Sequence, residues 1–122
     1  IYSELVHSLL QEKIPIHGMS HITGGGLPEN LPRCVPKGLR ARVHPESWDI
    51  PLNFKWLREV GQIPEVDFWN TFNLGIGFCL VLPQNFAIPS IEICRQFGVS
   101  AWIIGEIEES SSDISHLAGL PF

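Results

Sequence analysis

Apolar residues recur at helical spacing in three stretches of the chain, which predicts helices over residues 1–11, 52–60 and 86–97. Pro15 follows the first helix as a stop signal, and Gly61 and Gly98 are placed as left-handed C-caps of the other two. The third helix holds Pro89 in its first turn, where a missing amide proton costs little. Two shorter helical turns are predicted over residues 27–31 and 66–71.

Four further stretches have the pattern of strands, at residues 17–23, 39–43, 76–82 and 101–107. Within the third stretch, Phe78, Leu80 and Leu82 share one face. The intervening Cys79 and Val81 are also apolar, so this strand is predicted to be covered on both sides and to be central in its sheet. The order of helices and strands predicts one α+β or α/β layered domain, in which helices pack against a mixed sheet.

Composition fits a single domain. The chain has 122 residues, of which 44% are hydrophobic, and this is enough for one core of ordinary size. Four tryptophans and seven phenylalanines predict a core or an interface rich in aromatic rings. From residue 108 onward, serines and mixed charges predict surface or edge structure without a motif. Because the chain begins without methionine, directly in a helical pattern, we expect it to be a piece of a longer protein.

Charge and cysteine usage narrow the function classes. The formal net charge is −5 and there is no basic run, which argues against sequence-independent nucleic-acid binding. The three cysteines form no C-x-x-C pair, so we expect no disulfide framework and a reduced, cytoplasmic setting. No metal site is expected either, because there is no metal-ligand spacing among His7, His17, His44 and His116. The longest apolar run, residues 76–82, is too short to span a bilayer, which predicts a soluble protein without membrane partners.

The sequence HITGGGLPENLPR at residues 21–33 runs from a predicted strand through three glycines into a predicted helix start. Gly24, Gly25 and Gly26 permit positive φ or the close approach of a ligand. A strand that reaches a helix start in this way presents backbone N–H groups and the positive end of a dipole, which suits a phosphate. The stretch is neither a Walker A sequence nor a dinucleotide fingerprint, so an anion site and a tight structural turn are both open.

Side chains around the glycines add candidate chemistry. Thr23 can donate its hydroxyl to the same anion, or it simply ends a strand. His21 shares a strand face with Thr23 and is a candidate for proton transfer or donation to a substrate, the alternative being a hydrogen-bonded core histidine. Arg33 can fork onto a phosphate or carboxylate, with Asn30 hydrogen bonding nearby, although arginine here is often an ordinary ion-pair partner. Glu29 fits a charge favoured at a helix start.

A second candidate stretch is TFNLGIG at residues 71–77, where Asn73 precedes Gly75 and Gly77 at the entrance of a strand. A polar residue followed by two spaced glycines indicates a close backbone approach to a ligand or a neighbouring chain. The alternative is a bulge in a packed strand.

Four segments together resemble the carboxyl-terminal domain of the phosphoribosylformylglycinamidine cyclo-ligases, also called aminoimidazole ribonucleotide synthetases. They are HITGGGLPENLPR, FKWL at residues 54–57, GQIP at residues 61–64 and TFNLGIGF at residues 71–78. The likeness extends over residues 1–108 in the same order and with similar spacing. The run NLPR at residues 30–33 and the TFN-x-G-x-G stretch fit the cyclo-ligases better than other members of the superfamily.

The resemblance implies an ATP-dependent enzyme of purine biosynthesis that converts formylglycinamidine ribonucleotide into aminoimidazole ribonucleotide. It implies that residues 1–122 form the carboxyl-terminal domain of a two-domain enzyme, whose amino-terminal domain supplies most contacts to ATP and Mg²⁺ and pairs in a homodimer. The isolated chain is then expected to be inactive. The resemblance places His21 and Asn73 near the reacting end of the substrate. It places a second set at a phosphate of the substrate or nucleotide, namely Thr23, Gly24, Gly25, Gly26, Asn30 and Arg33.

Two alternative functions stay open at this point. One is a related enzyme with the same fold and another substrate, of the selenophosphate synthetase or hydrogenase maturation type. The other is a non-catalytic module that binds a phosphorylated metabolite or supports dimerisation. The TFNLGIGF stretch favours the cyclo-ligase, and the upstream reading frame would distinguish the three.

Overall fold

Two small sheets form the framework of the computed structural model, which describes residues 2–111 and 116–122. In the first sheet, β1 (Gly18–His21) pairs antiparallel with β3 (Phe78–Val81). In the second, β2 (Leu39–Val43) lies between β4 (Gly105–Glu109), which is antiparallel to it, and β5 (Leu117–Ala118), which is parallel. The predicted mixed sheet is therefore confirmed.

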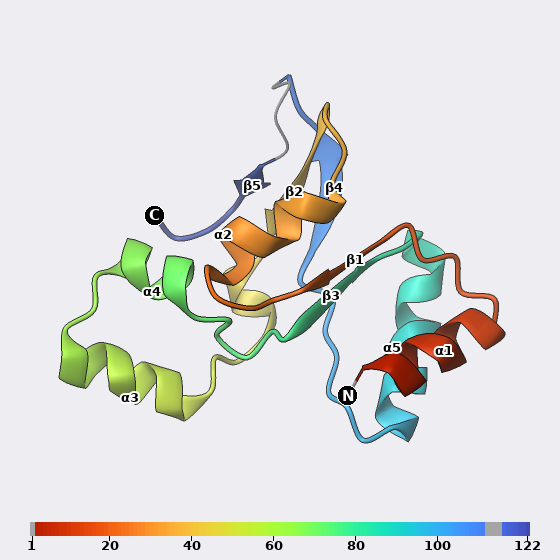
Figure 1. Cartoon of the computed structure of the whole chain (residues 1–122), viewed down its shortest axis with the longest axis horizontal. Coiled ribbons are helices and arrows are strands. Elements are labelled where there is room, and N and C mark those ends of the chain that lie inside the picture. The colour runs from red at the N-terminus through yellow and green to blue at the C-terminus, as the bar shows by residue number, and fades with distance from the viewer. Residues whose placement is uncertain (1, 112–115) are drawn as a thin grey trace.

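The helices gather at the two ends of the β1–β3 ribbon (Figure 1). At one end α1 (Ser3–Gln11) packs against α5 (Ala87–Gln96), and at the other α2 (Gly26–Asn30) packs against α4 (Glu65–Thr71), which follows α3 (Leu52–Gly61). Short 3₁₀ turns occupy Leu31–Cys34, Pro45–Ser47 and Gln84–Phe86. The α+β class predicted from the sequence is confirmed. No helix in the described part of the chain is long and apolar enough to cross a membrane.

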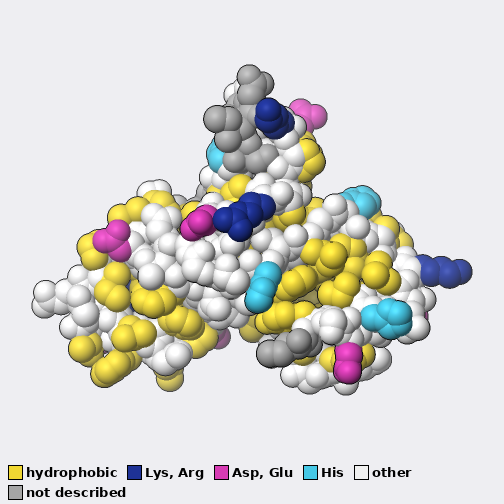
Figure 2. Space-filling view, in the orientation of Figure 1, with side chains coloured by type: hydrophobic (Ala, Val, Ile, Leu, Met, Phe, Trp, Pro, Cys, Tyr) yellow, Lys and Arg dark blue, Asp and Glu magenta, His cyan; other side chains and the backbone are white. Residues whose placement is uncertain are grey.

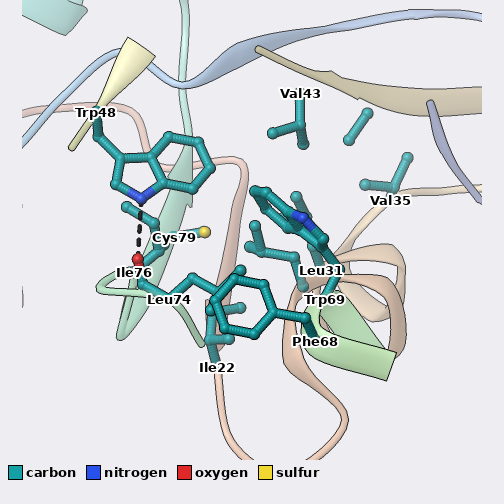
Figure 3. Close-up of a cluster of buried hydrophobic side chains, with 12 residues drawn as sticks. Ile22, Leu31, Val35, Val43, Trp48, Phe68, Trp69, Leu74, Ile76 and Cys79 are labelled. Atoms are coloured by element: carbon teal, nitrogen blue, oxygen red, sulfur yellow. Dashed lines mark hydrogen bonds between the residues drawn. The ribbon is translucent and has the colours of Figure 1, made fainter. Parts of the chain in front are cut away.

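The main core lies where α2 and α4 meet the two sheets (Figure 3). Leu27, Phe68 and Leu74 are almost completely buried there. The rings of Trp48 and Trp69 meet edge to face, with centroids 6.0 Å apart. The indole N–H of Trp48 donates to the carbonyl of Leu74 at 3.0 Å, so a polar atom inside the core keeps a partner.

A second, smaller core changes the interpretation of β3. It forms where Leu5 and Leu9 of α1 are buried against α5, and Leu80 and Leu82 pack against it. Cys79, on the other face of β3, belongs to the main core. The strand is apolar on both faces because it separates two cores. The prediction of a central strand is therefore wrong, since among the described residues β3 pairs with β1 alone.

Several element boundaries differ from the sequence predictions. The left-handed residue after α3 is Gln62, with φ of 50°, and Gly61 still belongs to the helix, whereas Gly98 has the predicted positive φ after α5. The strand predicted over residues 101–107 begins only at Gly105, because its pairing partner β2 ends opposite, at Val43. The ribbon strand β1 is also shorter than predicted.

The end of the chain forms an edge, as predicted, because β5 is the outer strand of the second sheet. Residues 112–115 of the predicted surface tail, and residue 1 of the first predicted helix, lie outside the described residues.

Candidate functional site

The two candidate stretches meet at one end of the β1–β3 ribbon. His21 lies opposite Phe78 in an antiparallel pair, so the residues after β1 lie beside those before β3. The backbone N–H of Ile22 donates to the carbonyl of Gly77 at 3.0 Å and extends this pairing towards the loops. We call residues 23–26 the glycine loop and residues 73–77 the Asn73 loop.

The three glycines of the glycine loop have different surroundings. Gly25 and Gly26 have φ of 95° and 64°, a left-handed conformation that favours glycine. A Cβ on Gly26 would lie 2.4 Å from the Trp69 carbonyl oxygen and 2.8 Å from that of Phe72, so this glycine lets α2 approach the end of α4. A Cβ on Gly24 would meet nothing within 4 Å. Packing therefore requires Gly26, while Gly24 lies open.

Asn30 holds the glycine loop from inside the protein. Its side chain is 2% exposed, and its amide donates to the carbonyl of Gly26 at 2.8 Å and to those of Thr23 and Gly24 at 3.3 Å each. Its Oδ1 accepts from the Thr23 hydroxyl, and its backbone carbonyl accepts from the Ser20 hydroxyl at 2.8 Å. The amide groups of Asn30 are thus engaged with the loop and give it its shape. Sequence reasoning missed Ser20, although its place on the inward face beside Ile22 could have indicated it.

Arg33 and Glu29 lie outside the loop as an exposed ion pair. Arg33 Nη2 is 3.4 Å from Glu29 Oε1, and the two side chains are 67% and 58% exposed. The Glu29 side chain folds back over the loop, because a Cβ on Gly25 would lie 1.7 Å from Oε2 of Glu29. The predicted ion-pair alternative for Arg33 is thus present. The pair is solvent-exposed, so a ligand anion can compete for the guanidinium at little cost.

His21 faces outward beside the two loops. Ser20 is buried on the inward face, whereas Met19 and His21 are exposed on the other, so His21 is not a core histidine. Its ring lies 6.1 Å from the rings of Tyr2 and Phe78, which stack on each other at 4.9 Å. The imidazole therefore has one aromatic side and one side open to solvent. Sequence reasoning assigned no role to Tyr2.

Asn73 shapes its own loop. Its Oδ1 accepts from the backbone N–H of Gly75 at 2.9 Å, which forms an Asx turn. Leu74 and Gly75 have φ of 55° and 98°, and Leu74 is completely buried. A Cβ on Gly75 would lie 2.7 Å from Cδ of Pro51. Gly75 thus allows the backbone to pack closely on Pro51, while the side-chain NH₂ of Asn73 can still donate. The predicted alternative, a bulge within a strand, is not present, because both glycines precede β3.

Burial disfavours the thiolate form of the two cysteines near the site, Cys34 and Cys79. Burial raises the pKa of the Cys79 thiol to about 12, with the neighbouring Cys34 contributing, and burial also raises the pKa of Cys34. Both thiols therefore stay protonated. Among the described residues, no three His, Cys, Asp or Glu side chains are grouped to hold a metal ion.

The two loops form one wall of the molecule, on which Thr23 and Gly24 are exposed while Leu74 and Ile76 are buried. Within the described residues, the backbone N–H groups of Gly24 and Gly25 have no hydrogen-bond acceptor. Two open hollows of 410 and 310 Å³ lie elsewhere, one along α2 and the end of the chain and one beside α5, and neither is lined by the glycine loop. Because the Glu29 carboxylate lies over Gly25 and pairs with Arg33, an anion in its place would lie near both the Gly25 backbone and the guanidinium.

Comparison with known proteins gives one family and many relatives. The family described as AIR synthase related protein, C-terminal domain, matches residues 3–117. The phosphoribosylformylglycinamidine cyclo-ligase of Prochlorococcus marinus (strain MIT 9211) is 57% identical over 122 residues, which are 99% of this chain and 35% of that protein. The cyclo-ligase of Prochlorococcus marinus (strain MIT 9313) is 52% identical over the same shares of the two chains. That of Synechococcus sp. (strain CC9311) is 55% identical over 91% of this chain and 32% of that protein.

The chain thus spans about a third of the length of the curated relatives it matches. The likeness to the cyclo-ligases expected from four short segments is confirmed over nearly the whole chain.

Proposed function

The chain belongs to the AIR synthase related protein family, whose C-terminal domain it forms, and on that premise we propose that it is the carboxyl-terminal part of an ATP-dependent phosphoribosylformylglycinamidine cyclo-ligase. The proposed intact protein converts formylglycinamidine ribonucleotide into aminoimidazole ribonucleotide in purine biosynthesis. The names of the relatives favour this reaction over those of the selenophosphate and hydrogenase maturation enzymes.

One observation carries the proposal furthest. The glycine loop and the Asn73 loop are separated by almost fifty residues in the sequence, yet they lie side by side at the same end of the β1–β3 ribbon. Both loops belong to segments that resemble the cyclo-ligases. The antiparallel pairing of β1 with β3 brings them together, and their meeting supports one shared ligand site because residues of both segments can then reach the same ligand.

We propose that the exposed half of this wall binds a phosphate of the substrate or nucleotide. The N–H groups of Gly24 and Gly25 and the guanidinium of Arg33 supply the donors, after Arg33 exchanges the Glu29 carboxylate for the anion. Thr23, Gly26 and Asn30 complete the anion site by fixing the shape of the loop.

We place His21 and Asn73 at the reacting end of the substrate. His21 has an imidazole side that is open to solvent, and Asn73 keeps an NH₂ group that can donate. In the proposed reaction the formyl amide oxygen attacks the γ-phosphorus of ATP and ADP leaves. The amidine-side nitrogen then attacks the activated carbon, phosphate leaves with that oxygen, and loss of a proton completes the imidazole ring.

The remaining parts of the machinery are proposed to lie in an amino-terminal domain of the intact protein. Most contacts to ATP and Mg²⁺ would come from carboxylates of that domain, because the described residues contain no suitable group of them. As the resemblance implies, we propose a cytoplasmic homodimer that pairs through the amino-terminal domains.

A chimeric protein tests this function. It joins the amino-terminal two thirds of the MIT 9211 relative to residues 1–122 of this chain, which replace the relative's matching third. We expect ATP-dependent ring closure, with ADP, phosphate and aminoimidazole ribonucleotide formed in equal amounts, and no turnover by residues 1–122 alone. A folded, dimeric chimera without turnover would overturn the proposal.

A further inference from the structure

An apolar stripe on α3 is left uncovered by the described part of the chain. Leu52, Trp56 and Val60 follow one another at intervals of four residues, so they lie on one side of the helix. Their exposed fractions are 80%, 61% and 63%. Figure 2 shows hydrophobic side chains gathered at the end of the molecule where Figure 1 draws α3, at the lower left. We call these three residues the α3 stripe.

Two residues on the opposite side of α3 contact the region of α4, although no residue of α3 is buried. The ring of Phe54 packs at 5.8 Å from that of Phe72. Arg58 forms an ion pair with Glu65 at 2.5 Å, and its guanidinium lies 5.4 Å from the centre of the Phe68 ring. The α3 stripe therefore lies on the side of the helix that faces away from these contacts.

The α3 stripe has the chemistry of an interface centre. Burial of a leucine or valine side chain is favourable in proportion to the apolar area removed from water, and tryptophan is among the residues that contribute most at protein interfaces. A contiguous row of such side chains is costly to leave in water. The row therefore indicates a surface that another part of a protein covers.

The α3 stripe also adjoins the proposed site. Pro51 directly precedes Leu52, and its ring lies against Gly75 of the Asn73 loop, where a Cβ would be 2.7 Å from Cδ. A protein domain that closes over the Asn73 loop would therefore reach the first turn of α3. The same domain can thus cover the α3 stripe and form the second wall of the site.

We propose that the α3 stripe is covered by the amino-terminal part of the intact protein, which corresponds to the two thirds of the relatives that this chain does not span. The inference rests on the proposed function. It adds the surface through which the two parts meet, with Trp56 at its centre and Leu52 beside the ligand site.

Thiol labelling measures the cover directly. Val60→Cys places a thiol on the α3 stripe, and Ile88→Cys places a matched one on α5, where Ile88 is apolar and 62% exposed. Each variant is made in residues 1–122 and in the chimera, and labelling by a maleimide is followed peptide by peptide, so that the native cysteines do not interfere. We expect labelling at position 60 to slow by about tenfold or more in the chimera, because a thiol at the core of an interface reacts only when it opens. Labelling at position 88 should not change.

Any other pattern of labelling contradicts the inference. Equal labelling of position 60 in both proteins, or equal slowing at positions 60 and 88, would show that the amino-terminal part does not cover the α3 stripe specifically. If position 60 is labelled slowly in residues 1–122 alone, and sedimentation shows that this protein is a dimer, a second copy of the chain covers the α3 stripe instead. Turnover of the chimera reports separately on the proposed function: an active chimera with fast labelling at position 60 overturns the inference alone, and an inactive one with slow labelling overturns the function alone.

Discussion

The inner and outer sides of the glycine loop are built from the same short stretch of sequence but have opposite properties. On the inner side, Gly26 and Asn30 are buried and bonded to the rest of the fold. On the outer side, Gly24 and Arg33 are exposed and contact little. We therefore propose that the inner residues determine the shape of the loop and that the outer residues are available to a ligand. The following variants should separate these two roles.

The largest effect should come from Gly26→Ala. The new Cβ would lie 2.4 Å from a backbone carbonyl oxygen at a φ of 64°, so we expect a loss of about 2–4 kcal/mol in the free energy of unfolding. Gly24→Ala is the matched control, and because its Cβ meets nothing within 4 Å it should change stability by less than about 1 kcal/mol. Urea unfolding measures both. Similar losses of unfolding free energy in the two variants would contradict the distinction between the inner and outer sides of the glycine loop.

Asn30→Ala should be the next most damaging change. It leaves the carbonyls of the loop without the buried amide that they bond, which costs about 2–3 kcal/mol of stability. Asn73→Ala removes a single bond from a partly buried Asx turn and should cost about 1 kcal/mol. The difference is measured as a shift in the urea midpoint at constant m-value. An Asn30 variant as stable as the Asn73 variant would contradict the inner role of Asn30.

Glu29→Gln tests the outer side. The pair with Arg33 is exposed, so stability should change by less than about 0.5 kcal/mol. Removing the charge that lies over Gly25 should strengthen the binding of inorganic phosphate about two- to fivefold, which titration calorimetry measures. Unchanged or weaker phosphate binding would show that the carboxylate does not compete with an anion there.

The smallest effect concerns a region remote from the loop in sequence, the charged ladder between β2 and β4. Hydrogen bonds from Arg42 and Arg40 lower the pKa of Glu108 to about 2. Because this folded-state pKa is below the ordinary value of 4.5, the stabilisation is complete above pH 4.5 and is lost as the pH falls towards 2. Urea midpoints between pH 5 and pH 2 should fall less steeply for Glu108→Gln than for the parent. Parallel curves for the two proteins would refute this assignment.

Sequence patterns predicted the helices and the layered class, because these depend on local spacing. A common site for His21 and Asn73 was implied only by the resemblance to the cyclo-ligases. The position of β3 was predicted wrongly, since apolar residues on both faces of a strand do not reveal whether strands or two separate cores cover it. The burial of Asn30 depends on backbone carbonyls that come together only when the glycines adopt positive φ. The exposure of Trp56 could not be predicted either, because the sequence pattern of an apolar helix face is the same whether the face packs on the core of its own domain or on another domain.

The most direct test of a ligand-binding outer side is Arg33→Ala in the chimera. The account predicts an unchanged melting temperature, because the arginine is exposed, and a KM for formylglycinamidine ribonucleotide or for ATP that rises by about tenfold or more, since a charge-assisted bond to phosphate contributes roughly 1–3 kcal/mol. Unchanged KM values for both compounds, at an unchanged melting temperature, would contradict the assignment of this wall to phosphate binding.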